Sequence, residues 1–142
     1  MRIITGWIVF LAVFLAVFLS VALYAQQPAT VWDGVYTQAQ ADRGKAQYGM
    51  YCASCHSADL SGTGQAPPLN GADFLGNWKG QTADDLFEKI QTSMPGDQPG
   101  KLTRAQNADI LAFLFASNGF PAGQKELPSD AAALAKIGIN QK

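Results

Sequence analysis

The sequence predicts a small all-α domain in which three main helices are joined by long loops that contain glycine and proline. Two observations support this fold class. Apolar residues beyond position 36 recur at intervals of three and four, which is the period of an amphipathic helix. Thr82 is followed three residues later by Asp85, and Thr103 by Gln106, and this spacing is typical of a capping box at a helix N-terminus.

The first helix is predicted to begin near Thr37 and to run into the cysteine motif at residues 52–56. One face of this helix carries its small and aromatic residues, Ala41, Gly44, Tyr48 and Tyr51. A helix with this buried face would bring the cysteine motif to the core of the domain.

The second helix is predicted to follow Thr82 and to bury Leu86, Phe87 and Ile90. It is expected to stop before Met94-Pro95, because a residue that precedes proline is biased away from the helical region. The loop that begins there would connect it to the third helix.

The third helix is predicted to follow Thr103 and to run to about Ser117, where Gly119 and Pro121 end it. Residues 110–115 form its most apolar stretch. A helix this apolar has to be covered on most of its surface. A domain of this size has a small core, so a large apolar cofactor could supply part of the cover. Most of the aromatic residues in this stretch are nevertheless expected to pack in an ordinary helix–helix core.

The N-terminus predicts export from the cytoplasm. Arg2 precedes an apolar run from Trp7 to Tyr24. Residues 1–25 are either a signal peptide or a retained membrane anchor, because the run has about the minimum length that spans a bilayer. The following residues are expected to lie in an oxidising compartment, the periplasm, either free or held at the cytoplasmic membrane by residues 3–25.

The remaining chain is expected to form one domain. Residues 26–36 would be an N-terminal extension, residues 37–120 the domain itself, and residues 121–142 a C-terminal tail. In this tail a short helix is expected to follow Ser129 and to run from Asp130 to Ile137.

The charge balance excludes some classes of partner. The chain has ten Lys and Arg against eleven Asp and Glu, without a block of either sign. Nucleic-acid binding and attraction to an anionic membrane surface therefore have no electrostatic basis, and the only expected membrane contact is through an uncleaved N-terminal anchor. Docking to protein partners is expected to rely on a mostly apolar contact.

The motif Cys52-Ala53-Ser54-Cys55-His56 contains both cysteines and the only histidine of the chain. Cys-x-x-Cys-His is the attachment signature of haem c. Cys52 and Cys55 would bind the two vinyl groups of one haem, and His56 would be an axial ligand of the iron.

Three other uses of these residues are less satisfactory. A structural zinc site takes four ligands, so a carboxylate would have to join the three residues present. A thioredoxin-like redox pair is expected within a β-α-β pattern, and no convincing strand runs flank the motif. A disulfide in an exported protein would leave His56 without a role.

The sixth ligand of the iron is predicted by elimination. No second histidine exists, Met1 lies in the export segment, and Met50 is too close to Cys52 to reach the opposite face readily. Met94 remains, in a loop between two predicted helices, and a methionine thioether is an established haem ligand. The usual role of a methionine is packing in the core, which is the alternative for Met94.

The order of these features resembles that of the class I monohaem cytochromes c, over nearly all of residues 37–120. The resemblance implies a class I cytochrome c fold, with three main helices and loops around one covalently bound haem. It implies that Gly44 and Tyr48 pack on the last helix, at Ile110 and Phe113. It also implies that a proline carbonyl, of Pro67 or its neighbour Pro68, accepts the free ring N–H of the axial histidine.

A closer resemblance is to small periplasmic cytochromes c that accompany quinoprotein (PQQ) dehydrogenases. It rests on three segments, Val31-Trp32-Asp33-Gly34-Val35-Tyr36-Thr37, Phe74-Leu75-Gly76-Asn77-Trp78 and Asn118-Gly119-Phe120-Pro121-Ala122-Gly123 with Glu126-Leu127-Pro128. Trp78 would either donate its indole N–H to a haem propionate or pack at the haem edge.

The predicted function is electron transfer rather than enzymatic catalysis. Iron held by both His56 and Met94 has no open position for a substrate. The expected partners are an exported dehydrogenase as donor and a terminal oxidase or another cytochrome as acceptor. Two alternatives remain open: a membrane-anchored subunit of a respiratory complex, and a haem sensor or enzyme in which the Met94 ligand is labile.

Overall fold

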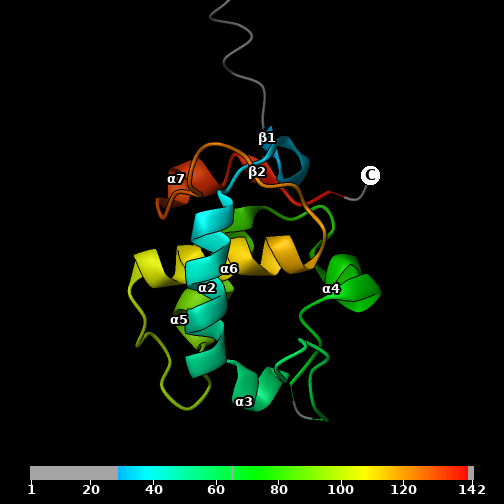
Figure 1. Ribbon diagram of the computed structural model, residues 1–142, viewed down its shortest axis with the longest axis vertical. Helices are drawn as coiled ribbons and strands as arrows, with labels where there is room; N and C mark the ends of the chain where they lie inside the picture. The colour runs from blue at the N-terminus through cyan, green and yellow to red at the C-terminus, as the bar shows by residue number, and fades with distance from the viewer. Residues whose placement is uncertain (1–28, 65, 141–142) are drawn as a thin grey trace, which may run out of the picture.

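The computed structural model of the protein describes residues 29–64 and 66–140. The predicted export segment, residues 1–25, lies outside the described residues. Residues 29–64 and 66–140 form a mostly helical domain, as the predicted fold class requires, together with a two-stranded sheet that the sequence did not predict (Figure 1). In chain order the elements are β1 (Ala29–Thr30), the 3-10 helix η1 (Val31–Asp33), α2 (Gln38–Tyr51), α3 (Ala53–His56), α4 (Gly71–Trp78), α5 (Ala83–Ser93), α6 (Arg104–Ser117), α7 (Ala131–Leu134) and β2 (Ile137–Gly138).

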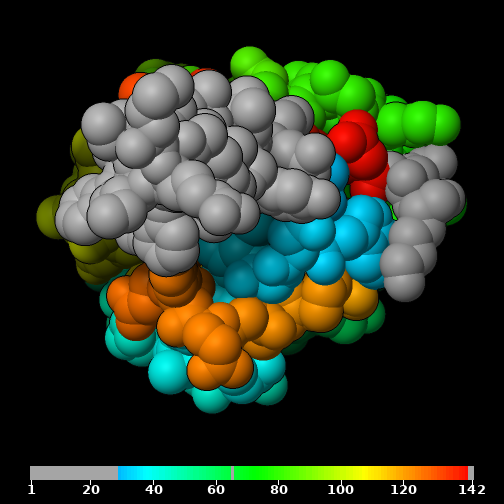
Figure 2. All heavy atoms as spheres, turned by 90° about the horizontal axis from the view of Figure 1, so that it is seen from above, coloured from blue at the N-terminus to red at the C-terminus, as the bar shows by residue number. Residues whose placement is uncertain are grey.

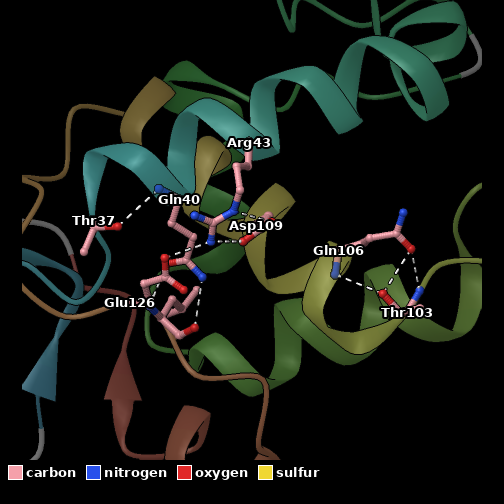
Figure 3. Close-up of polar contacts among 8 residues, drawn as sticks. Thr37, Gln40, Arg43, Thr103, Gln106, Asp109 and Glu126 are labelled. Carbon is pink, nitrogen blue, oxygen red and sulfur yellow. Dashed lines mark hydrogen bonds and ion pairs between the residues drawn. The ribbon is translucent and has the colours of Figure 1, made fainter.

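The three main helices are confirmed as α2, α5 and α6, and side-chain caps begin each of them. The hydroxyl of Thr37 accepts the backbone N–H of Gln40 at the start of α2. Both predicted capping boxes are present, at Thr82 for α5 and at Thr103 for α6. Figure 3 shows the second of these boxes, in which Gln106 and Thr103 exchange hydrogen bonds. These caps satisfy N–H groups that a helix leaves unpaired in its first turn.

Helix α2 crosses α6 at the centre of the domain (Figure 1). The two backbones approach closely at Gly44, where a Cβ atom would lie 1.8 Å from the carbonyl oxygen of Asp109. One turn further along α2, the ring centroid of Tyr48 is 5.3 Å from that of Phe113. Gly44 and Tyr48 therefore pack on the last helix, as the resemblance implied.

Polar contacts hold the crossing together and attach the C-terminal segment to it (Figure 3). The Arg43 guanidinium donates from two nitrogens to the Asp109 carboxylate, at 3.0 and 2.9 Å, and also contacts Glu126 at 2.9 Å. The buried side-chain amide of Gln40 exchanges two hydrogen bonds with the backbone of Leu127. Residues from three parts of the chain are thereby joined on one side of α2.

The segments that flank the main helices lie against each other at one end of the molecule. Figure 2 shows the N-terminal described segment in blue beside the segment that follows α6, in orange. The N–H of Gly123 donates to the carbonyl of Tyr36 at 2.6 Å. Strands β1 and β2 pair in parallel, with Ala29 opposite Ile137, and the Trp32 indole donates to the carbonyl of Asn140.

Helices α4 and α7 also differ from the prediction. The C-terminal helix α7 ends at Leu134, so the expectation of a helix to Ile137 was wrong at its end. Ile137 is buried and pairs with Ala29 in the small sheet, an interaction between residues far apart in sequence. Helix α4 was not predicted, because eight residues with two glycines give a weak periodic pattern.

Among residues 29–64 and 66–140, none of the helices combines the length and the hydropathy that a membrane span needs.

Replacing Gly44 by Ala is expected to destabilise the protein, because the methyl group of the alanine would force α2 and α6 apart. The expected loss is about 1–3 kcal/mol of unfolding free energy, the usual cost of overpacking a core. Gly49→Ala on the same helix is the control: nothing lies within 4 Å of its Cβ position, so it should stabilise by about 0.5–1 kcal/mol. Guanidinium unfolding of the haem-loaded protein measures both, and equal effects would contradict the close approach.

Candidate haem site

The cysteine motif forms a tight turn at the end of α2. The N–H of Cys52 donates to the carbonyl of Tyr48 and so closes α2, and the N–H of His56 donates to the carbonyl of Cys52 in α3. Both distances are 2.9 Å. The motif therefore takes its position directly from α2, whose place on α6 is set by Gly44.

The two cysteines are free thiols in different surroundings. Cys52 is partly buried and Cys55 is exposed. Burial raises the pKa of the Cys52 thiol to about 11. A reactive cysteine of a redox enzyme has instead a lowered pKa, because the thiolate is the nucleophile. The surroundings of Cys52 thus disfavour the thioredoxin-like use of this pair.

His56 is buried and held by one backbone carbonyl. The residue as a whole is only 7% exposed to solvent. The Nδ1 atom of its ring lies 2.9 Å from the carbonyl oxygen of Pro67. A carbonyl oxygen can only accept, so Nδ1 carries the ring proton and the lone pair of Nε2 is free. This is the form of histidine that binds a metal ion. The contact with Pro67 is the one expected from the resemblance, while the neighbouring Pro68 lines the same cavity.

A network of hydrogen bonds holds the loop that supplies this carbonyl. Burial raises the pKa of Tyr48 to about 12, so its hydroxyl remains protonated and donates to the carbonyl of Ser57 at 2.6 Å. The Ser57 hydroxyl donates to the carbonyl of Gly62, whose N–H donates to the carbonyl of His56 at 3.0 Å. Gly62 has a φ of +76°, and a Cβ there would lie 2.7 Å from the carbonyl carbon of Pro67.

A cavity of about 720 Å³ opens beside the motif. This volume lies within the range of cavities that bind drug-sized ligands and cofactors. Its interior is mostly apolar, with side chains from α4, α5 and α6. The apolar lining residues are Leu69, Phe74, Trp78, Leu86, Ile90, Ile110 and Leu114. The third helix thus leaves part of its apolar surface to the cavity, as its composition predicted.

Met94 lines this cavity together with three residues of the cysteine motif, Cys52, Cys55 and His56. It is the residue that closes α5, through a hydrogen bond from its N–H to the carbonyl of Ile90 at 3.0 Å. Met50 also borders the cavity, but its side chain points largely to solvent, with 64% of the residue exposed. The structure therefore brings together all four residues expected to bind the cofactor.

Trp78 also lines the cavity, as the last residue of α4. Its ring is half-buried and lies 6.5 Å from that of Phe74, in a tilted arrangement. The sequence did not predict that α4 forms a wall of the cavity. Tyr51 and Lys101 also line the cavity, and neither was predicted to be a site residue. Only for Tyr51 did the sequence contain a relevant indication, because it lies on the predicted buried face of α2.

The residues present fit a covalently attached haem. Two free thiols, a histidine with a free Nε2 and a thioether border one mostly apolar cavity. A zinc site would need a carboxylate beside the motif. Within the described ranges, no three or more His, Cys, Asp and Glu side chains are grouped as metal ligands.

One known sequence family matches most of the helical part of the chain. Its description is "Cytochrome C oxidase, cbb3-type, subunit III", and it matches residues 39–114. The match begins in α2 and ends in α6, so it contains every residue that lines the cavity. No curated protein sequence matches the chain.

A solved structure with a similar arrangement is the crystal structure of the sulfane dehydrogenase SoxCD from Paracoccus pantotrophus. The two are 24% identical over 68% of this chain and 53% of that chain, with a TM-score of 0.46. The similarity therefore spans about half of that chain.

Gly62→Ala is expected to disturb the loop that holds His56, because the added methyl group would collide with the backbone of residues 66–68. The expected loss of unfolding free energy is about 1–3 kcal/mol, from the collision and the positive φ. Gly64→Ala in the same loop is the control, since nothing lies within 4 Å of its Cβ position. Denaturant unfolding should separate the two variants, and a Gly62→Ala protein as stable as the control would refute this packing.

Proposed function

Because this chain belongs to the family of the cbb3-type cytochrome c oxidase subunit III, and is thus a c-type cytochrome that carries electrons on haem c, we propose that it is an exported single-electron carrier with both axial positions of the iron filled by His56 and Met94. The observation that supports this proposal best is the single cavity that Cys52, Cys55, His56 and Met94 share.

Attachment of the cofactor is assigned to Cys52 and Cys55. Each thiol would form a thioether bond with one vinyl group of the haem. The tight turn at the end of α2 keeps the two cysteines and His56 on a short stretch of backbone. The cofactor would then be attached at the C-terminal end of α2 and in α3, next to the helix that crosses α6.

His56 and Met94, as the proposed ligands of the iron, would determine the redox properties of the haem. Haem c supplies a reversible change between the ferric and ferrous states. Pro67 keeps the proton on Nδ1 of His56, which orients the ring and increases its basicity toward a metal at Nε2. A thioether from Met94 favours the ferrous state and raises the reduction potential. The apolar walls of the cavity act in the same direction, because they disfavour the additional charge of the ferric state.

Electron transfer follows from a filled coordination sphere. If His56 and Met94 both held the iron, the protein would offer no position at which dioxygen, peroxide or a substrate could bind. The alternative is a sensor or enzyme in which Met94 leaves readily. Met94 is partly buried against the hydrophobic core and lines the cavity, which supports the carrier instead.

The proposed location is the periplasm, and the partners are other redox proteins. The donor would be an exported dehydrogenase, with a quinoprotein dehydrogenase as the specific candidate, and the acceptor a terminal oxidase or another cytochrome. The weak net charge of −1 favours apolar docking over strong electrostatic steering. The resemblance of three sequence segments to dehydrogenase-associated cytochromes supports this donor.

A second candidate is a membrane-anchored subunit of a respiratory complex. Two observations favour it: the description of the matching family names an oxidase subunit, and an apolar run from Trp7 to Tyr24 precedes the domain. In that case the domain would carry electrons within an assembly, without acting as a free shuttle.

Met94→Ala is expected to retain covalently bound haem but to lose the low-spin ferric spectrum, because the sixth ligand is removed. Met50→Ala is the matched control, since Met50 borders the same cavity with an exposed side chain. Its spectrum should equal that of the unmodified protein. Absorption spectra of the ferric proteins decide the matter: a methionine charge-transfer band that persists in Met94→Ala, or disappears in Met50→Ala, would overturn the assignment.

Mass spectrometry of the mature protein distinguishes the free shuttle from the anchored subunit. A free periplasmic carrier is expected to lack residues 1–22 or residues 1–25, according to whether cleavage follows Ala22 or Ala25. Its mass should correspond to the shortened chain plus one haem. A mature protein that retains the run from Trp7 to Tyr24 would support the anchored form and exclude the free one.

A further inference from the structure

The loop between α5 and α6 contacts α2 across the edge of the cavity. Its last part carries Lys101, whose Nζ lies 5.5 Å from the ring centroid of Tyr51. Tyr51 is the last residue of α2 and immediately precedes Cys52. Both side chains line the cavity. This contact therefore connects the half of the site that contains the cysteine motif with the half that contains Met94.

The two ends of this loop are fixed by other means. Met94 begins it, with its N–H bonded to the carbonyl of Ile90 at 3.0 Å. At the other end Leu102 is buried, and its carbonyl accepts from the side-chain amide of Gln91 at 3.3 Å. The side-chain amide of the fully buried Asn107 donates a hydrogen bond to the side-chain oxygen of Gln91, at 2.8 Å.

Between these ends the loop is largely exposed. Its internal hydrogen bonds run from Gln98 to Pro95 and from Lys101 to Gln98, so they hold the loop to itself and not to α2. Residues 96–101 are all exposed. Lys101, at the end of this exposed stretch, makes a cation–π contact with Tyr51 of α2.

We propose that the Lys101–Tyr51 cation–π contact is a latch that positions the Met94 loop and limits how often Met94 leaves the iron. This inference rests on the proposed function, because it requires that Met94 is a ligand. A displacement of the loop that carries Met94 away from the site would also displace residues 95–101, and the latch opposes that displacement. Lys101 and Tyr51 are positioning residues, and neither is assigned contact with the iron.

The size of the effect follows from the strength of the contact. At an exposed site a cation–π interaction shifts an equilibrium by about two- to fivefold. The rate at which the Met94 position opens should rise by that factor when either partner is removed. Removing both should add little to removing one, because the two residues act through a single contact.

Binding of imidazole to the ferric, haem-loaded protein measures this opening rate. At high imidazole concentration the observed rate reaches a limit, which is set by departure of Met94. We expect Lys101→Met and Tyr51→Leu to raise this limit by about two- to fivefold, and the double variant to match the single ones. Lys101→Arg and Tyr51→Phe should stay close to the unmodified protein, because both retain a cation over an aromatic face.

A second cation–π contact in the same domain supplies the control. The Arg104 guanidinium lies 4.5 Å from the ring centroid of Phe87, and neither residue lines the cavity. Arg104 also forms an ion pair with Glu88 at 3.0 Å, so Arg104→Met should reduce stability at least as much as Lys101→Met. Its limiting rate of imidazole binding should nevertheless be unchanged. An equal increase in Arg104→Met would show a general loss of stability and overturn the latch.

The outcomes separate this inference from the proposed function. An unchanged limiting rate in Lys101→Met, with a normal methionine spectrum, would refute the latch and leave Met94 as ligand. A rate that rises equally in Lys101→Arg would also refute it. If the unmodified protein showed no limiting rate and no methionine band, the Met94 assignment itself would fail.

Discussion

The close approach of α2 to α6 is the constraint on which the other parts of the structure depend. It requires a residue without a side chain at Gly44, because any Cβ would collide with the backbone at Asp109. Once the helices cross there, Tyr48 reaches Phe113 and Arg43 reaches Asp109. The crossing is thus closed by an apolar contact on one side of Gly44 and an ion pair on the other.

The same crossing places the cofactor site. Tyr48 packs its ring on α6 and donates its hydroxyl to Ser57, so one side chain connects the crossing with the loop that holds His56. The motif follows α2 without an intervening linker. Helix α6 in turn contributes Ile110 and Leu114 to the wall of the cavity. The geometry of the haem site is therefore a consequence of how two helices meet, and the loops complete it.

The sequence was most informative where structure is decided locally. Capping boxes at Thr82 and Thr103 involve neighbouring residues, so the starts of α5 and α6 could be predicted. The Cys-x-x-Cys-His spacing is likewise local. The pairing of Ala29 with Ile137 joins residues more than a hundred positions apart, and such contacts depend on the finished fold. The cation–π contact of Lys101 with Tyr51 escaped prediction for the same reason.

The most direct measurement of the central claim is the response of the ferrous protein to carbon monoxide. A ligand of this kind binds quickly where the sixth position is open or weakly held. With His56 and Met94 both on the iron, the spectrum of the reduced protein should remain unchanged on mixing with carbon monoxide. Immediate formation of a carbon monoxide complex would show an accessible site and contradict the assignment of this protein as a six-coordinate electron carrier.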